Sequence, residues 1–471
     1  MPGWPQYREW LKLPPEDRPA AFERSPPALA DFSTDSRSIS PGQWFIPLVG
    51  ERFDGHRFIG DVMAAGAAGF LYDRKAAAMV PAACLDAGIP VGDTGEALRN
   101  IAAGWRGALP DLRLMALTGS TGKTTVKEML SAVVARAAPS LVTSGSFNNE
   151  IGVPLTLLQL REEHRYGVLE FGARHSGDIR LLCRMADPDI RAVLNAGSAH
   201  IGEFGSLALL RRTKLEMLTT PRDDGSMDFT GIVCGDDPHL LEGARAGGSR
   251  LLTFGLSPGN DIRVIGSEGS ATGGQTIHLA TPRGDLRFTL PAFHISHPIN
   301  TAAAAAMALA AGLGPTDIRN GLESFQGVKG RFRIHQLSGR TLIDDAYNAN
   351  PASMEAGLQT LIRAWSGRRK ALILGDMKEL GEESRARHED LGRLCATVPG
   401  VNRLILVGEE CQVAAAAARA AGFPAEHIHQ MADVQEVLEN IDIMVENSDL
   451  IYVKGSNSIG LEQVVATLIE A

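Results

Sequence analysis

The sequence predicts an α/β protein of three domains: a central P-loop-type parallel sheet with helices, a C-terminal Rossmann-like α/β domain and a smaller N-terminal α/β domain. Three observations support this prediction. The chain has 471 residues, too many for one hydrophobic core. Short apolar strands alternate with helical stretches along most of its length, which is typical of parallel sheets covered by helices. A glycine-rich turn resembling a phosphate-binding loop joins one such strand to one such helix.

The N-terminal domain is expected over residues 1–108. It begins irregular and proline-rich and continues through GQWFIPLVGERFDGHRF to an expected helix at 58–69 and a short strand at 70–73. The first residues carry prolines and charges where a signal peptide would need an apolar run, so we expect a cytoplasmic protein.

The central domain is expected over 109–325, with strands that alternate with helices at 113–118, 166–172, 190–195, 231–237 and 250–255. The segment 261–293 alternates polar and apolar residues between glycine-rich turns, as antiparallel hairpins do. The alanine-rich stretch 301–313 falls short of the roughly 18 residues that a membrane span needs. It therefore predicts a packed helix, and we expect no membrane insertion.

The C-terminal domain is expected over 326–471. Strands again alternate with helical stretches there, including a helix near 384–398. Its expected strands lie at 341–344, 370–375, 403–408, 427–430 and 450–455.

The composition excludes some classes of function. Lys and Arg number 46 against 55 Asp and Glu, for a net charge of −9, and no basic block is present, which argues against a nucleic-acid binder. The five cysteines are scattered without a CxxC pair. Reduced thiols are therefore expected, and neither a disulfide framework nor a zinc site is indicated.

The strongest motif is GSTGKTT at 119–125. It lacks the first glycine of the full phosphate-loop pattern, and Leu117 stands there instead. A strand precedes it, and an amphipathic helix follows, so several backbone N–H groups would point at one spot where an anion can sit. Because the helix dipole contributes only about 0.3–1 kcal/mol, Lys123 and a metal ion on Thr124 would supply the rest. The alternative is a Gly/Ser turn with a surface lysine.

Other polar residues follow the strands at the edge where open α/β sheets bind ligands. Glu170 ends an apolar strand and needs a cationic partner or a metal, and an arginine salt bridge is the alternative. His200 follows the next strand, although a lone histidine is more often structural. Lys214 lies in a helical stretch and would by default be a solvated surface lysine.

Two features belong to the third domain. The sequence DDAYNANP at 344–351 places a dense polar loop after a strand, which indicates a ligand-binding loop, with a bland turn as the alternative. Arg331 stands at the domain junction, where it can reach a phosphate or pair with a carboxylate.

Together these motifs resemble the Mur ligases, ATP-dependent amide-forming enzymes of peptidoglycan precursor synthesis. The resemblance covers nearly the whole chain after about residue 30. It is carried by TDSR, GERFDGH, GSTGKTTVKEM, NNEIGVPLTLL, EFGARHSGDI, AHIGEFGS, DDAYNANP, GDMKELG and VKGSNS.

The resemblance implies roles for individual residues. Catalytic roles fall on Lys123, Glu170, His200 and Lys214, the last of which is carbamylated in many members. Two Mg²⁺ ions are expected on Thr124, Glu170, His200 and Lys214. The ATP-binding residues would be Gly119, Ser120, Thr121, Gly122, Lys123, Thr124, Thr125, Asn300, Arg331, Asp345 and Tyr347. Substrate-binding residues would be Ser36, Arg37, Asp54, His56, Asn148, Asn149, Asn348, Asn350 and Lys454.

Two positions depart from the family pattern. SHPIN replaces a commoner HN run ahead of Asn300, and Asn457 stands where an arginine is frequent.

The implied reaction joins D-alanyl-D-alanine to the carboxylate of UDP-N-acetylmuramoyl-tripeptide through an acyl phosphate, with release of ADP. A monomer acting on these small molecules is expected. The alternatives are a sister ligase that adds a single amino acid or extends folate with glutamate, and a P-loop NTPase switch. The identity of the third peptide residue, meso-diaminopimelate or lysine, is left open.

Overall fold

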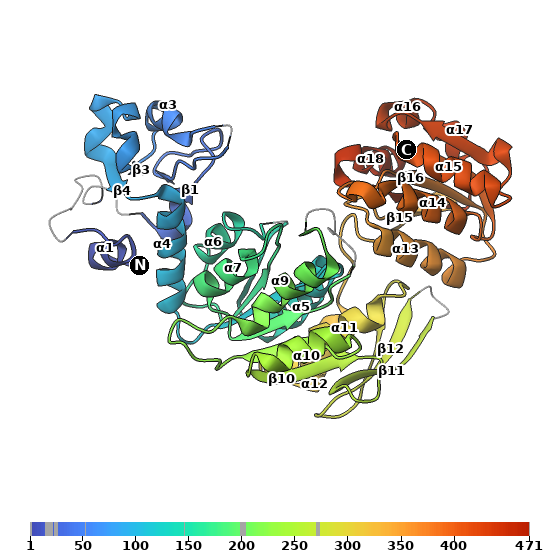
Figure 1. Cartoon of the computed structure of the whole chain (residues 1–471), viewed down its shortest axis with the longest axis horizontal. Helices are drawn as coiled ribbons and strands as arrows, with labels where there is room; N and C mark the ends of the chain where they lie inside the picture. Colours follow the sequence, from blue (N-terminus) through green and yellow to red (C-terminus); the bar gives the residue numbers. More distant parts are fainter. Residues whose placement is uncertain are drawn as a thin grey trace.

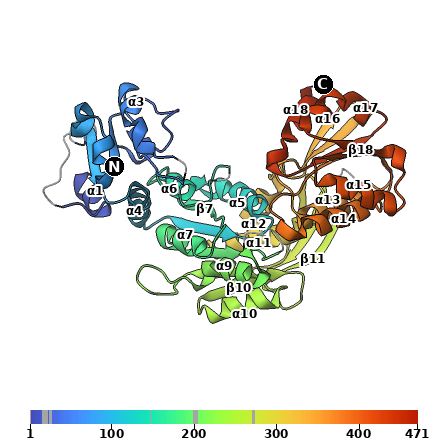
Figure 2. The same ribbon diagram turned by 45° about the horizontal axis from the view of Figure 1, so that its top comes forward.

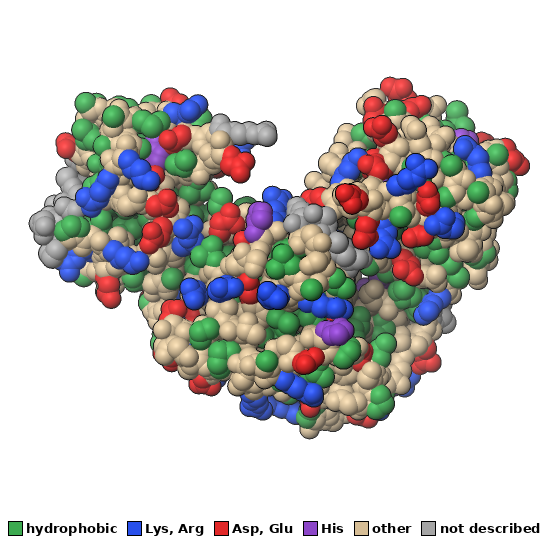
Figure 3. Space-filling model, in the orientation of Figure 1, with side chains coloured by type: hydrophobic (Ala, Val, Ile, Leu, Met, Phe, Trp, Pro, Cys, Tyr) green, Lys and Arg blue, Asp and Glu red, His purple; other side chains and the backbone are tan. Residues whose placement is uncertain are grey.

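Three β-sheets, each with its own helices, follow one another along the chain. The structure is a computed structural model that describes residues 2–14, 22, 27–51, 53–145, 147–197, 204–269 and 274–470. Figure 1 shows the N-terminal and C-terminal units at opposite ends of the central unit. The surface is hollowed between these two units (Figure 3). The predicted α/β class with three domains is confirmed.

The N-terminal unit is built on a four-stranded parallel sheet in the order β1-β2-β3-β4. The expected helix at 58–69 is shorter, because Gly66 adopts a left-handed backbone conformation with φ of 95°. The strands are β1 (Phe32–Ser33), β2 (Trp44–Phe45), β3 (Gly69–Asp73) and β4 (Gly88–Val91). The helices are α1 (Trp4–Trp10), α3 (Ile59–Ala64) and α4 (Thr94–Gly107), with 3₁₀ turns η1 (Leu29–Asp31), η2 (Gly55–Phe58), η3 (Arg74–Met79) and η4 (Ala82–Ala87).

The central unit holds a nine-stranded sheet in the order β13-β12-β11-β10-β9-β8-β5-β7-β6. Strands β5 to β11 are paired in parallel, and β11, β12 and β13 form the antiparallel hairpins expected at 261–293. The strands are β5 (Arg113–Thr118), β6 (Ser140–Val142), β7 (Tyr166–Glu170), β8 (Ile190–Val193), β9 (Thr230–Cys234), β10 (Arg250–Gly255), β11 (Ile262–Gly269), β12 (Gln275–Ala280) and β13 (Leu286–Leu290).

Helices cover both faces of this central sheet. Along β5, Leu114 and Ala116 face one core with α4, α6, α7 and α9, whereas Met115 and Leu117 face the other core with α5, α11 and α12. The apolar stripe predicted for α5 is fully buried, and the alanine-rich stretch is the packed helix α11. The helices are α5 (Lys123–Ala137), α6 (Gly152–Leu157), α7 (Asp178–Ala186), α9 (Leu207–Thr219), α10 (Pro238–Ala246), α11 (His297–Ala310) and α12 (Pro315–Glu323).

The C-terminal unit has a six-stranded sheet in the order β14-β15-β19-β16-β17-β18. All five strands expected here form, and the structure adds the antiparallel edge strand β14. The strands are β14 (Arg333–Leu337), β15 (Arg340–Asp344), β16 (Lys370–Gly375), β17 (Val401–Val407), β18 (Ile428–Met431) and β19 (Leu450–Lys454). Its helices and 3₁₀ turns are α13 (Pro351–Ala364), η5 (Gly381–Glu383), α14 (Ser384–Cys395), α15 (Cys411–Ala420), η6 (Ala425–His427), α16 (Val434–Glu439), α17 (Ile441–Val445), η7 (Asn457–Ile459) and α18 (Glu462–Glu470).

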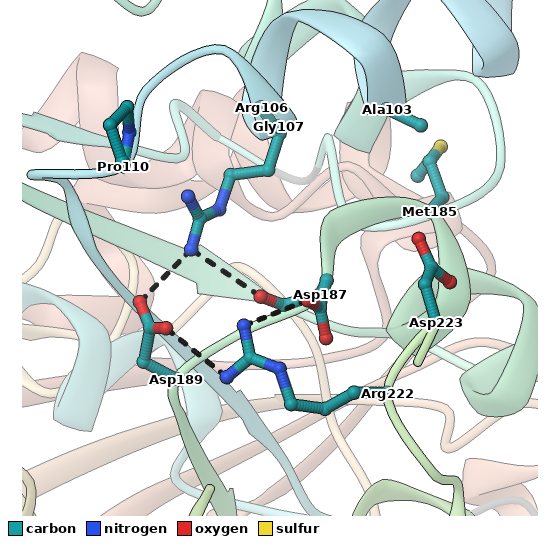
Figure 4. Close-up of a pocket in the computed structure, with 9 residues that line it drawn as sticks. All are labelled: Ala103, Arg106, Gly107, Pro110, Met185, Asp187, Asp189, Arg222 and Asp223. Carbon is teal, nitrogen blue, oxygen red and sulfur yellow. Dashed lines mark hydrogen bonds and ion pairs between the residues drawn. The ribbon is translucent and has the colours of Figure 1, made fainter. Parts of the chain in front are cut away.

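A partly buried ion-pair cluster links the N-terminal unit to the central unit (Figure 4). Arg106 of α4 donates from Nη2 to Asp189 Oδ2 at 3.0 Å, and Arg222 donates to the other oxygen of Asp189 at 3.3 Å. Next to Arg106, Trp105 donates from Nε1 to the Leu160 carbonyl at 3.1 Å. These hydrogen bonds and ion pairs tie α4 to the central unit.

The joint to the C-terminal unit is smaller and rests on residues in unusual backbone conformations. Gly327, Gly330 and Phe332 have φ of 80°, 71° and 56°. The His294 ring meets the Phe332 ring edge-on at 4.6 Å. Figure 2 shows the C-terminal unit next to α11, the helix that follows His294. The C-terminal unit is therefore joined to the central unit by a short linker and a few contacts.

Candidate active site

The phosphate-binding loop sits where the structure brings several predicted residues together. Strand β5 ends at Thr118, and α5 begins at Lys123 after Gly122, whose φ is 79°. A side chain at Gly122 would be strained there, and its Cβ would lie 2.8 Å from Asn300 Oδ1. The loop therefore presents the N-terminus of a helix of 15 residues as an anion site, next to the predicted nucleotide contact Asn300.

The lysine of this loop is folded back onto it. Lys123 Nζ donates to the Gly119 carbonyl at 2.8 Å. Burial lowers the pKa of Lys123, while the nearby Glu170 carboxylate opposes that shift and the Arg331 guanidinium adds to it. Residues from the central and C-terminal units thus share one electrostatic environment.

An asparagine missed by the sequence reasoning holds the loop in shape. Asn195, two residues after β8, accepts hydrogen bonds from Ser120 N and Thr121 N at 3.0 Å each and donates to Thr121 O at 3.0 Å. Its only sequence signal is its place after a strand at the ligand-binding edge of the sheet. The remaining loop residue of the prediction, Thr125, lies in the first turn of α5 and is half-buried.

Glu170 is the centre of the site. It ends β7 beside β5 and is 3% exposed. One carboxylate oxygen accepts from the Thr124 hydroxyl at 3.0 Å and the other from Asn148 Nδ2 at 2.9 Å. The arginine salt bridge considered as an alternative is not what the structure shows, because hydroxyl and amide donors occupy the carboxylate. The side chain therefore links the nucleotide loop to the loop that carries Asn148.

Lys214 is buried, so the default interpretation as a solvated surface lysine is wrong. It is 2% exposed on α9. Burial lowers its pKa from 10.5 to about 7, and the charge of Lys123 contributes to the shift. Folding therefore increases the share of the neutral, nucleophilic amine near pH 7 relative to an exposed lysine. The fourth predicted catalytic residue, His200, lies outside the described residues.

The C-terminal unit contributes a second buried carboxylate. Asp345 Oδ2 accepts from Lys454 Nζ at 2.9 Å and from the Tyr452 hydroxyl at 2.9 Å, while Oδ1 accepts from Phe332 N at 3.1 Å. Burial lowers the pKa of Lys454 and raises that of Tyr452. Tyr452 was not predicted, because an apolar strand with one tyrosine carries no signal for such a contact.

Two further predicted nucleotide contacts, Arg331 and Tyr347, pack against each other in the same unit. The Arg331 guanidinium stacks on the Tyr347 ring at 4.2 Å from the ring centroid, which places both predicted nucleotide contacts together. Lys454 also donates to the Asn348 carbonyl at 3.0 Å. The polar loop after β15 is therefore organised around Asp345.

Several predicted substrate residues have structural partners. Asn149 accepts from Gly152 N at 2.8 Å at the start of α6, Asn350 caps α13 and accepts from Ser353 N at 2.9 Å, and Asn348 accepts from Ala349 N at 2.9 Å. Their predicted substrate contacts stay predictions.

The predicted residues of the N-terminal unit fall into two groups. Arg37, which follows Ser36, is exposed and pairs with Asp35 at 2.8 Å. His56 is fully buried; its Nδ1 lies 2.6 Å from Asp54 Oδ1, and its Nε2 accepts from Asp73 N at 2.9 Å. The His56 ring thus holds the loop together from within, and its predicted substrate contact stays a prediction.

A P-loop helix bonded to a buried carboxylate, in a chain of three α/β units, is typical of a nucleotide-dependent enzyme. Family descriptions match along the chain: "Mur ligase family, catalytic domain" at 32–106, "Mur ligase middle domain" at 117–308 and "Mur ligase, glutamate ligase domain" at 330–457. The chain belongs to the Mur ligase family and is an ATP-dependent, ADP-forming ligase.

Individual relatives are similar in sequence to this chain along nearly its full length. The chain is 35% identical over 445 residues to the UDP-N-acetylmuramoyl-tripeptide--D-alanyl-D-alanine ligase of Escherichia coli (strain K12), covering 93% of each chain. It is 33% identical over 441 residues to the enzyme of the same name from Bacillus subtilis (strain 168), again with 93% of each chain covered.

Solved structures agree as well. A crystal structure of MurF from Acinetobacter baumannii superposes with a TM-score of 0.84 at 32% identity, covering 100% of this chain and 99% of that one. MurF ligase from Thermotoga maritima in complex with ADP gives a TM-score of 0.79 at 25% identity, covering 94% and 98%. Within the described part of the chain, the helices are all too short or too polar to cross a membrane.

Proposed function

We propose that this chain joins D-alanyl-D-alanine to UDP-N-acetylmuramoyl-tripeptide at the expense of ATP, in the synthesis of peptidoglycan precursors. The peptide carboxylate attacks the γ-phosphorus of ATP, and ADP leaves. The free amino group of D-alanyl-D-alanine then attacks the acyl phosphate, the C–O bond to phosphate breaks, and the nitrogen loses a proton. Relatives that are 33–35% identical over 93% of the chain carry the name of this reaction.

The observation that carries the proposal is the bridge from Thr124 through Glu170 to Asn148. It joins the loop that binds phosphates to a second polar loop at the same sheet edge. An enzyme that must bring a γ-phosphate to a carboxylate needs this proximity, because correct placement of two reactants can supply about 7–11 kcal/mol of the barrier. A nucleotide switch needs no second loop.

The donor set at this bridge fits Mg²⁺. Thr124 and Glu170 offer hydroxyl and carboxylate oxygens 3.0 Å apart, and Mg²⁺ takes oxygen ligands. We assign one ion to Thr124 and a second to Glu170, with His200 and a carbamylated Lys214 as its further ligands. Bound there, Mg²⁺ neutralises the repulsion between phosphate and carboxylate. Lys123 leaves the Gly119 carbonyl and binds the β/γ end of the triphosphate.

The outer units complete the active site. Asn300 of the central unit contacts the nucleotide beside the phosphate loop. Closure of the C-terminal unit brings Arg331 and Asp345 onto the nucleotide, with Tyr347 beside them, and excludes water from the acyl phosphate. The residues proposed to bind the UDP end are Ser36, Arg37, Asp54 and His56. Those proposed to bind the peptide are Asn148, Asn149, Asn348, Asn350 and, at the end of β19, Lys454.

We propose domain boundaries at 108 and 325. They are supported by the position of α4, which ends at Gly107 before β5, and of α12, which ends at Glu323 before β14. We further propose that the chain acts as a monomer in the cytoplasm.

The proposal is tested by ADP and phosphate release from Mg-ATP. We expect release to depend on both UDP-N-acetylmuramoyl-tripeptide and D-alanyl-D-alanine, and tripeptides ending in meso-diaminopimelate or lysine should be compared. Release with single amino acids or with folate and glutamate would identify a sister ligase. Slow hydrolysis that neither peptide nor amine changes would identify a switch and refute the proposal.

A further inference from the structure

Lys127 is a buried lysine of α5 that the proposed chemistry does not use. Lys127 is fully buried, with 0% of its surface exposed. The Nζ atom donates to the Thr143 carbonyl at 2.6 Å and pairs with Glu128 Oε1 at 2.8 Å. A buried ammonium group is costly unless it is paired and hydrogen-bonded. The question is therefore what the contact with Thr143 achieves.

Thr143 forms the root of a bridging loop, which we define by its described residues 143–145, 147 and 148. Thr143 follows β6 and is 2% exposed. Its N–H donates to the Val168 carbonyl at 2.9 Å, and its hydroxyl accepts from Glu170 N at 3.3 Å. The residue that Lys127 holds thus holds the backbone of Glu170 in turn.

The far end of the bridging loop is fastened to the same strand. Asn148 donates from Nδ2 to the Glu170 carboxylate at 2.9 Å, and its carbonyl accepts from Gly172 N at 2.8 Å. Because Thr143 and Asn148 are both bonded to Glu170 and its neighbours, strand β7 couples the position of Asn148 to that of Thr143.

The helix of the nucleotide loop touches both parts of this arrangement. Thr124 and Lys127 are three residues apart on α5 and therefore lie on the same face of the helix. Thr124 contacts the Glu170 carboxylate, and Lys127 contacts the loop root. One helix thus sets the positions of Glu170 and of the bridging loop together.

We propose that Lys127 is a positioning residue for the ligation, acting through Thr143 to hold Asn148 and Glu170 in register with the nucleotide loop. This inference rests on the proposed function, because the bridging loop is there expected to face the peptide carboxylate. Lys127 touches neither substrate. Its loss shifts the loop relative to the γ-phosphate, and a misplacement near 1 Å can cost about 100-fold in rate.

The test compares Lys127→Met with Lys127→Arg and Glu128→Gln in the full-length enzyme. For Lys127→Met we expect kcat with UDP-N-acetylmuramoyl-tripeptide to fall about 10- to 100-fold while the Kd of ADP changes less than about threefold. Lys127→Arg retains a cationic donor and should recover part of kcat. Glu128→Gln removes the ion pair but keeps the Thr143 contact, so it should lower the melting temperature and leave kcat near that of the wild type.

A second variant covers the case in which Lys127→Met does not fold. Thr143→Val removes the hydroxyl that accepts from Glu170 N, and we expect the same loss of kcat with unchanged ADP binding; Thr143→Ser is its matched control. Wild-type kcat in a folded Lys127→Met or Thr143→Val variant would overturn the inference, as would equal losses of kcat in Glu128→Gln and Lys127→Met. Failure of the proposed function would instead show as an inactive wild-type enzyme.

Discussion

The hydroxyl of Thr124 donates a hydrogen bond of 3.0 Å to the carboxylate of Glu170. The first residue belongs to the helix that follows the nucleotide loop and the second to the end of the neighbouring strand. This contact joins two oxygen groups, which we propose as metal ligands, at the edge where the phosphates are expected. It places the chemistry at the junction of β5, β7 and α5.

Removal of the Thr124 hydroxyl should therefore impair catalysis more than folding. We expect Thr124→Val to lower kcat by roughly 100-fold, because stabilisation of charge at one such site contributes about 2.7–4 kcal/mol to the barrier. Thr124→Ser keeps the hydroxyl and is the control. Steady-state kinetics and a thermal melt of both variants provide the measurement, and a Thr124→Val enzyme with normal kcat would exclude the hydroxyl as a ligand.

Lys214 should be essential for activity and replaceable in part by a small acid. Its buried amine, with a pKa of about 7, is expected to carry a carbamate that serves as a metal ligand. Lys214→Ala should lose nearly all activity and regain some of it when short carboxylic acids are added. Arg212→Ala, an exposed change on the same helix, should have little effect. Full activity of Lys214→Ala would contradict the assignment.

The ion pair at Asp345 should matter more to stability than the neighbouring phenol. Lys454→Met leaves a buried carboxylate without its cation, which costs about 3–5 kcal/mol. Tyr452→Phe removes one hydrogen bond to the same charge and should cost about 1.5–3 kcal/mol. Urea unfolding followed by circular dichroism checks the order. A larger loss in Tyr452→Phe would show that the Lys454 charge is not what stabilises Asp345.

Two histidines with lowered pKa values, the half-buried His294 and the buried His297, should make the protein sensitive to acid. Burial lowers the pKa of His294 and of His297 to about 3 each, so both are neutral when folded and gain protons on unfolding below about pH 6.5. The unfolded state then binds more protons, and stability is lost as the pH falls from 6.5 towards 3, by up to about 1.4 kcal/mol per pH unit for each ring.

The variant His297→Asn should flatten this dependence. It removes one titrating ring and keeps a donor for the Ala292 carbonyl, which lies 3.1 Å from His297 Nδ1. Melting temperatures measured from pH 7 to pH 5 should fall less steeply in His297→Asn than in the wild type. Parallel curves would show that His297 does not titrate on unfolding.

The sequence predicts those helices and strands whose formation depends on residues that are neighbours in the chain. The strands before Gly119 and Glu170 are apolar runs, and the helix stripe of α5 repeats every 3.6 residues, so both are visible in the sequence. Leu117, which stands where a longer phosphate loop would have a glycine, is fully buried as part of β5. Strand β14 was missed because Arg333–Leu337 carries no clear apolar alternation.

The site was predicted less completely, because its contacts join residues far apart in the chain. Asn195 lies 75 residues from Ser120, and Tyr452 lies 107 residues from Asp345. The burial of Lys214 depends on the packing of α9 against other elements, for which the helix sequence alone has no signal.

The ion pair between Arg106 and Asp189 has a consequence for substrate choice. Since it ties α4 to the central unit, and since we propose that the N-terminal unit binds the UDP end of the substrate, we expect the distance from that end to Glu170 to vary little. A peptide shorter by one residue would end about 3.5 Å away from the reacting position, beyond the reach of a hydrogen bond. We therefore expect this chain to select its peptide substrate by length as well as by side chain.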